Sequence, residues 1–243
     1  GPAPVHVYQN LTDTVQQYPV MLIASNPFGC VDTSFSSIQV YPKPVAQFSA
    51  IPSTGCSPLA VTLNNSSSLA QSNQWIYGTG DTLQLNDPSH GFTYVNTSAA
   101  PLAYTLRLIV TSAEGCTSTV TRPINVYPEV HAQFNMSPEG CSPLSVVFDN
   151  NTTGASSHLW NFGDGFQGIT HSPTHTYYNL GQADSLFNVQ LTSTSQYGCT
   201  DTDMDTVVVH PLPVADFTLS EIEGCSPLTV NITDMSTGGG TYA

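Results

Sequence analysis

Basic residues are almost absent from this sequence. Its 243 residues include only three Lys and Arg against 17 Asp and Glu, so the formal net charge is −14. A partner such as nucleic acid, or the anionic surface of a membrane, is bound through clusters of Lys and Arg. We therefore exclude both kinds of partner. The acidity itself has two interpretations, namely solubility through self-repulsion or the binding of cations.

Long apolar runs and helical periodicity are also missing. No stretch approaches the roughly 20 apolar residues that span a bilayer, so we expect no membrane insertion. Charged residues make up only 8% of the chain. However, Val, Ile, Leu, Tyr and Phe recur in short alternating runs, which a disordered chain would lack. The pattern predicts an all-β fold with a surface of hydroxyl and amide groups.

Catalytic motifs are absent as well. The sequence has no Gly-x-Ser-x-Gly elbow, no Gly-rich phosphate loop and no His-Glu-x-x-His. Its six cysteines never show Cys-x-x-Cys spacing, which argues against a zinc site. Cysteine and histidine recur along the chain, which a single active site would not require. We predict that the chain is not an enzyme and needs no cofactor. Calcium is the one cation that we consider as a possible ligand.

What the sequence does contain is an internal repeat. Gly-Cys-Ser-Pro-Leu occurs three times, at 55–59, 140–144 and 224–228. A second Gly-Cys pair alternates with these motifs, at 29–30, 115–116 and 198–199. The spacing corresponds to a period of about 85 residues. Such a period indicates a tandem array of similar modules.

Proline marks the module boundaries. A Val-rich run ends in Val-Tyr-Pro or Val-His-Pro at 40–42, 126–128 and 209–211, where proline ends a strand. We expect the second half of one module at 1–43, complete modules at 44–129 and 130–212, and the opening of a fourth at 213–243. Because both outer modules are cut, the chain is expected to be a window on a longer protein.

Short β-type runs fill each module. In residues 44–129 they are Val45–Ser49, Leu59–Leu63, Gln74–Tyr77, Phe92–Tyr94, Tyr104–Val110 and Thr119–Val126. About seven strands in about 85 residues predict an immunoglobulin-like β-sandwich. One histidine per module falls at a matching place in the repeat: His6, His90 and His175. We interpret them as strand-end imidazoles with structural hydrogen bonds rather than as metal ligands.

One signature within 130–212 is more specific. It consists of Trp160-Asn-Phe162-Gly-Asp164-Gly, Pro173-Thr-His175-Thr-Tyr177 and Phe187-Asn-Val-Gln-Leu191. These residues closely resemble the PKD (polycystic kidney disease) domain. With the added cysteine motifs, the chain resembles the tandem PKD arrays of very large secreted proteins of Bacteroidota. The resemblance implies surface display, extracellular localisation, and a role in adhesion or in reaching across space.

Several side chains are assigned structural roles on this basis. The predicted core residues are Trp75, Trp160, Tyr8, Phe92 and Tyr177. The alternative for the two tryptophans is an exposed platform for carbohydrate.

Four carboxylates are weighed as calcium ligands. Asp164 is interpreted as a turn residue, because Thr79 replaces it in the preceding module, with calcium as the alternative. Asp201, Asp203 and Asp205 alternate along one strand face, which indicates a solvated acidic face or, again, a calcium site.

The cysteines imply an oxidising compartment. Bonds within a module would join Cys56 to Cys116 and Cys141 to Cys199. Sandwich topology argues against these bonds, because the two cysteines fall at opposite ends of a module and a disulfide needs Cα atoms about 5.5 Å apart. We therefore predict an inter-module bond between Cys56 and Cys199. Cys141 and Cys225 would then reach later modules, and Cys30 and Cys116 earlier ones, with bonds between chains as a further alternative.

These features predict a disulfide-stapled rod that serves structure or attachment on a bacterial surface. Its partners would be neighbouring modules and identical chains in a homo-oligomeric filament. The alternative is a non-catalytic binding or spacer module of a secreted hydrolase acting on polysaccharide or collagen. That alternative requires a row of exposed aromatics, for which Tyr177, Tyr178 and Tyr197 are the candidates.

Overall fold

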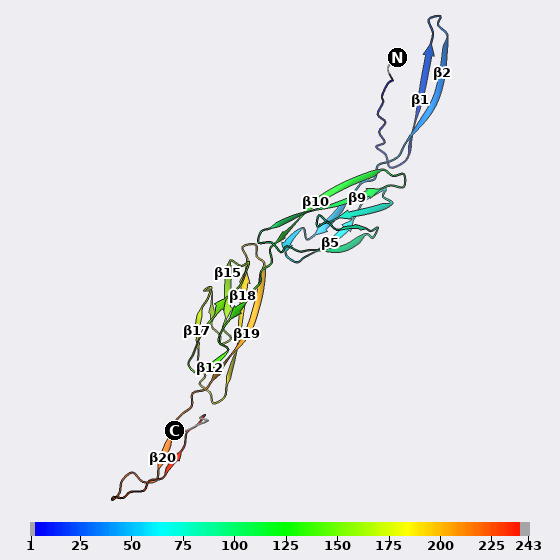
Figure 1. Ribbon diagram of the computed structural model, residues 1–243. Helices are drawn as coiled ribbons and strands as arrows, with labels where there is room; N and C mark the ends of the chain where they lie inside the picture. Colours follow the sequence, from blue (N-terminus) through cyan, green and yellow to red (C-terminus); the bar gives the residue numbers. More distant parts are fainter. Residues whose placement is uncertain (1–2, 239–243) are drawn as a thin grey trace. The chain divides into compact units, whose positions relative to one another are not determined.

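The computed structural model describes residues 3–238, and every regular element among them is a β-strand (Figure 1). The predicted all-β class is therefore confirmed. The chain divides into two compact units, Gly1–Pro128 and Glu129–Ala243. Each unit is built around one β-sandwich, and the two are described separately below.

The sandwich of the first unit, called here the first sandwich, has a three-stranded and a five-stranded sheet. The smaller sheet has the order β3 (Phe48–Ile51), β5 (Leu59–Asn65), β8 (Ser89–Tyr94). The larger sheet has the order β4 (Thr54–Cys56), β10 (Thr117–Tyr127), β9 (Leu102–Thr111), β6 (Ser72–Ile76), β7 (Thr82–Gln84). Alternate residues of β9 point into the core, where Leu106, Leu108 and Val110 are fully buried.

The second sandwich, in the other unit, repeats this strand order in its large sheet. That sheet runs β12 (Glu139–Cys141), β19 (Thr200–His210), β18 (Ser185–Thr194), β15 (Ser157–Asn161), β16 (Gln167–Gly168). Opposite it lie two short ladders, β11 (Phe134–Asn135) with β14 (Asp149–Asn150), and β13 (Leu144–Val147) with β17 (Thr174–Tyr177). A further ladder near the C-terminus joins β20 (Phe217–Leu219) to β21 (Ile232–Asp234).

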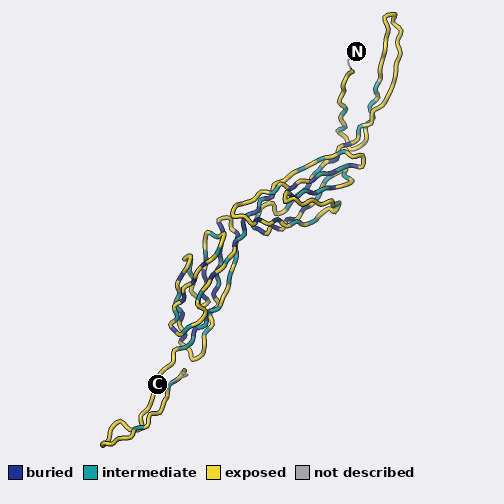
Figure 2. The backbone as a smooth tube through the Cα atoms, viewed as in Figure 1, coloured by how far each residue is buried: buried dark blue, intermediate teal, exposed yellow. Residues whose placement is uncertain are grey.

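The N-terminal hairpin pairs β1 (Gln16–Ser25) with β2 (Val31–Val40) in a regular antiparallel ladder. Most of its residues are exposed, including Met21, Leu22 and Phe35, whereas buried residues concentrate in the two sandwiches (Figure 2). Among the described residues, no second sheet is paired with this hairpin.

Two of the five predicted core residues differ from the prediction. Trp75, Trp160 and Tyr177 are fully buried, but Phe92 and Tyr8 are only half-buried. Tyr8 packs on Tyr18, with ring centroids 5.3 Å apart, on a hairpin that no second sheet covers among the described residues.

The strand register explains why Phe92 is not the core residue that was predicted. Leu59 pairs with Tyr94 and Leu144 pairs with Tyr177, so Tyr94 is the counterpart of Tyr177 and is fully buried. The matching of His90 to His175 in the sequence had aligned Phe92 with Tyr177, two residues early. A shift of two residues keeps the same face of a strand, so the alternating pattern could not reveal the slip.

Short strands at the sheet edges were also missed. No strand was expected between Ser49 and Leu59, whereas the structure places Cys56 in β4, which pairs in parallel with β10. β7 was not expected either. Strands of three residues are too short to show an alternating pattern, and their formation depends on the neighbouring strand that offers free backbone groups.

Candidate functional site

The cysteines mark opposite ends of each sandwich. Cys56 lies opposite Tyr127, the last residue of β10, and Cys141 lies opposite His210, the last residue of β19. Each sandwich thus carries its first cysteine beside the C-terminal end of its longest strand.

The second cysteine of each sandwich closes the hairpin before that strand. Cys116 immediately precedes β10, where the Ser112 amide donates to its carbonyl over 2.9 Å and its own amide donates to Ser112 Oγ over 3.3 Å. Cys199 precedes β19 and has the same two bonds with Ser195, over 2.8 and 3.1 Å. The backbone of the second cysteine is therefore fixed at the N-terminal end of the strand by one bond from a serine amide and one to the same serine's hydroxyl.

This placement separates the two cysteines of one sandwich by a full strand. β10 and β19 each have 11 residues. At about 3.3 Å per residue, such a strand is roughly 35 Å long, far beyond the Cα separation of about 5.5 Å in a disulfide. Cys56 and Cys199 are disulfide-bonded, whereas Cys30, Cys116, Cys141 and Cys225 are free thiols. The oxidised residues are the two that the sequence had paired.

A buried asparagine supports the Cys56 end of the first sandwich. Asn96 Nδ2 donates to the carbonyls of Ala100 and Val126, over 2.8 Å each. The Asn96 amide donates to Ser57 Oγ over 3.0 Å, so the residue after Cys56 is tied to the same corner.

The same arrangement around an asparagine recurs in the second sandwich and beside the N-terminal hairpin. Asn179 makes the matching bonds to Ala183, Val209 and Ser142 in the second sandwich, and Asn10 bonds Thr14 and Val40 in the N-terminal hairpin. Sequence reasoning missed this corner, although Tyr-x-Asn at 8–10, 94–96 and 177–179 was visible as a signal.

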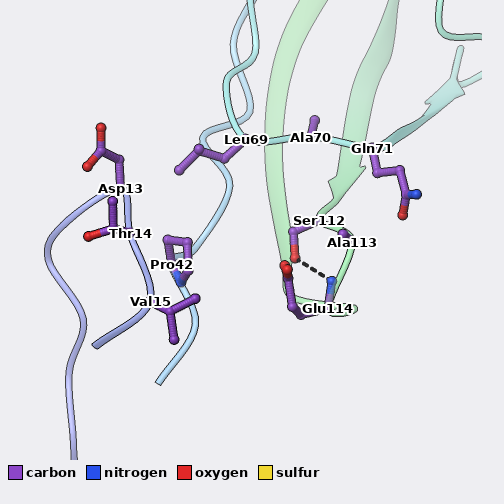
Figure 3. Close-up of a pocket in the computed structure, with 10 residues that line it drawn as sticks. All are labelled: Asp13, Thr14, Val15, Pro42, Leu69, Ala70, Gln71, Ser112, Ala113 and Glu114. Atoms are coloured by element: carbon purple, nitrogen blue, oxygen red, sulfur yellow. Dashed lines mark hydrogen bonds between the residues drawn. The ribbon is translucent and has the colours of Figure 1, made fainter. Parts of the chain in front are cut away.

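A hollow of about 440 Å³ lies in the first unit, close to the hairpin that carries Cys116 (Figure 3). Residues 13–15 and Pro42 form one wall, and residues 69–71 and 112–114 form the other. The only charged groups in its lining are the carboxylates of Asp13 and Glu114. The lining has no basic group, and the hydroxyl of Ser112 accepts hydrogen bonds from the amides of Glu114 and Cys116.

Asp164 uses both carboxylate oxygens within the protein. Its Oδ2 lies 2.6 Å from His175 Nε2, and its Oδ1 accepts a hydrogen bond from the Phe166 amide over 3.1 Å. Gly163, immediately before it in the turn, has a φ of +82°, which favours glycine. A turn role for Asp164 is consistent with this geometry, since both of its oxygens have hydrogen-bond partners within the protein.

The acidic triplet has a role that the sequence did not indicate. Asp201 Oδ2 accepts from the Ala132 amide over 2.8 Å, and Asp203 Oδ2 accepts from the Phe134 amide over 3.0 Å. Asp201 and Asp203 therefore accept hydrogen bonds from backbone amides just before and within β11, and the expectation of a merely solvated face is wrong for these two. Asp205 is exposed and bonds only the Thr206 amide, over 2.7 Å. No group of three or more His, Cys, Asp or Glu among residues 3–238 is arranged to hold a metal ion.

The histidines of the repeat do not all occupy one position. His175 stacks on Phe162 with ring centroids 4.2 Å apart, and Phe92 stacks on Tyr77 at 3.8 Å. Phe92, not His90, is therefore the counterpart of His175. His90 Nε2 lies 2.9 Å from Tyr77 Oη, and burial lowers its pKa below the usual value, although the nearby Asp87 opposes that shift.

Residues 125–209 match the family model of the PKD domain. Among solved structures, the PKD1 domain of the Vibrio cholerae metalloprotease PrtV is 30% identical and aligns with 34% of this chain and 98% of its own, with a TM-score of 0.29. The PKD1 domain of Vibrio anguillarum Epp is 26% identical over 35% and 96%, with a TM-score of 0.29. Murine CEACAM1b is 12% identical over 70% and 100%, with a TM-score of 0.33. No curated protein matches the sequence.

The second sandwich is accordingly a PKD domain, and both sandwiches have the immunoglobulin-like fold class. PKD domains are typical of extracellular proteins, where they serve as adhesive or spacer modules and are usually non-catalytic. Within residues 3–238 there is no helix of the length and apolar character needed to cross a membrane.

Proposed function

We propose that the chain is a rod segment of a very large bacterial surface protein, in which consecutive modules are joined by disulfides. The modules would be those expected from the repeat, 44–129 and 130–212, flanked by partial modules at 1–43 and 213–243. The rod would serve attachment or span distance outside the cell.

The placement of the cysteines carries this proposal. Because the two cysteines of a sandwich lie at opposite ends of an 11-residue strand, neither can close a bond within its own module. A bond from Cys56 to Cys199 would instead staple module 44–129 to module 130–212. By the same rule Cys141 and Cys225 would bond later modules, and Cys30 and Cys116 earlier ones.

Disulfides between modules would suit a rod that carries tension. A short Pro-containing linker and one covalent bond at each junction limit swivelling, because two connections fix an orientation that one leaves free. The surface also suits packing of identical chains through hydroxyl and amide groups, since three basic residues cannot supply many ion pairs. A homo-oligomeric filament is the assembly that we propose.

Electron microscopy of the protein released from its native source tests the proposal. Long uniform fibres with an axial repeat of one or two modules are expected, and their width distinguishes a single stalk from a bundle. Short flexible particles with one large globular end would overturn it. They would favour the spacer role in a secreted hydrolase, although Tyr177 is buried and cannot join the aromatic row which that role requires.

A further inference from the structure

A pair of histidines lies on the second sandwich, apart from the cysteines. His158 is on β15, and His171 follows β16. His158 Nε2 and His171 Nδ1 are 3.2 Å apart. We propose that these two nitrogens are the protein ligands of a divalent transition-metal ion of the class that prefers imidazole, such as Zn²⁺, Cu²⁺ or Ni²⁺.

The separation of the two nitrogens fits a shared metal ion. Imidazole nitrogens bind Zn²⁺ at about 2.0–2.1 Å, and two such bonds at a tetrahedral angle place the nitrogens about 3.4 Å apart. The observed 3.2 Å is close to that value. A metal ion can therefore replace the proton between the rings with only a small opening of the pair.

The rest of the pocket holds the two rings in place. His158 Nδ1 lies 3.0 Å from Oγ of Ser193, which is fully buried and lies 3.3 Å from Thr152 Oγ1. A hydrogen bond at the second ring nitrogen is the contact that orients a metal-bound histidine. Asn150 Nδ2 donates to the His171 carbonyl over 3.0 Å, which fixes the backbone of the second ligand. The same amide lies 3.4 Å from His171 Nδ1, a contact that a metal ion at that nitrogen would replace.

The site is open to the ion and to water. A hollow of about 600 Å³ is lined by both histidines together with Ser156, Ser157 and Ile169. His171 is exposed and His158 is half-buried. Two protein ligands leave the remaining coordination positions for solvent or for a donor group from another molecule.

The first sandwich shows that the fold does not require histidines here. Asn73 stands two residues before Trp75, as His158 stands two residues before Trp160. Asn73 Nδ2 donates to Asn86 Oδ1 over 3.3 Å, so an amide pair makes the corresponding contact. Amides are weak ligands for these metals, whereas imidazoles are strong ones. The first sandwich is thus a natural negative control in the same chain.

Titration calorimetry with Zn²⁺ on the full chain tests the proposal, with the free thiols first blocked by iodoacetamide because thiolates would compete for zinc. The variants are His158→Asn and His171→Asn, which copy the amide pair, and His131→Asn is the matched control. One site is expected in the wild type, with at least tenfold weaker binding in either variant and unchanged binding in the control.

Nitrogen-15 spectra of the imidazoles in the unsubstituted chain provide the second measurement, which does not depend on how the variants fold. Substoichiometric Zn²⁺ should shift His158 Nε2 and His171 Nδ1 before the nitrogens of any other histidine. Binding within twofold of the wild type in both folded variants, or first shifts at other histidines, would overturn the proposal.

Discussion

Cys56 lies opposite Tyr127 at the C-terminal end of β10, while Cys116 precedes the first residue of the same strand. Every residue of an 11-residue strand therefore separates the two cysteines of the first sandwich. The same relationship holds for Cys141 and Cys199 on β19. This separation determines which disulfides a single module can form, and from it follows the first prediction.

Non-reducing peptide mapping should recover a Cys56–Cys199 peptide and none that joins Cys56 to Cys116. The reason is the strand length of roughly 35 Å, which no side-chain movement can bridge. Replacing Cys56 with Ser should leave Cys199 as a free thiol that can be alkylated, and replacing Cys199 with Ser should do the same for Cys56. A Cys56–Cys116 peptide from protein alkylated before unfolding would contradict the prediction.

The two buried tryptophans should differ in their tolerance of phenylalanine. Trp160 Nε1 donates to the Thr170 carbonyl over 3.0 Å, whereas Trp75 Nε1 is buried without a partner in the described structure. Trp160→Phe loses a hydrogen bond and leaves a carbonyl unsatisfied, so it should cost about 1 kcal/mol more unfolding free energy than Trp75→Phe. Urea melts followed for each sandwich measure the difference, and equal costs would show that the indole bond contributes nothing.

Asn179→Ala should destabilise the second sandwich by about 1–3 kcal/mol, because the Ala183 carbonyl and the buried Val209 carbonyl near the end of β19 lose the donor that Asn179 supplies. The exposed Asn151 is the matched control, since its side chain makes one long bond of 3.4 Å to the Asp149 carbonyl. Asn151→Ala should change the unfolding free energy by less than about 0.5 kcal/mol. Equal effects of the two substitutions would argue against the asparagine corner as a structural element.

Stability of the first sandwich should fall as the pH is lowered below the ordinary histidine value of 6.5, in part because of His90. Burial lowers the pKa of His90, so the unfolded state takes up its proton at a higher pH than the folded state does. His90→Gln should flatten this part of the pH profile of unfolding free energy. His210, on β19 of the second sandwich, is the opposite case, because its hydrogen bond to Asp184 raises its pKa. Its contribution to the stability of the second sandwich is present below pH 6.5 and is lost as the pH rises above that value, and His210→Gln should remove this loss. A pH profile of unfolding free energy that neither substitution changes would contradict these roles of His90 and His210.

Removal of calcium should leave the melting temperature of the second sandwich unchanged. The oxygens of Asp164 and one oxygen each of Asp201 and Asp203 already accept hydrogen bonds from the protein. Asp203→Ala should destabilise by about 1–3 kcal/mol in EDTA and in calcium alike, because the Phe134 amide loses its acceptor. A calcium-dependent rise in the melting temperature that Asp203→Ala abolishes would instead establish a calcium site.

The sequence by itself determined the fold class and the turns. Alternating apolar residues and the Gly-Asp-Gly turn act locally, through strand geometry and the φ of Gly163, so no knowledge of distant contacts was needed. The spacing of the cysteines already indicated that partners within one module would lie too far apart. The full burial of Trp160 also follows from an apolar ring on a central strand.

Only the tertiary structure decided the register and the polar contacts. A shift of two residues leaves the inward face of a strand unchanged, so the sequence could not choose between Phe92 and Tyr94, and the pairing of β8 with β5 made the choice. Asp201 meets the Ala132 amide, and His158 meets His171, across gaps of 69 and 13 residues. Such contacts depend on how the sheets pack, because side chains that are distant in sequence become neighbours only when the strands are in place.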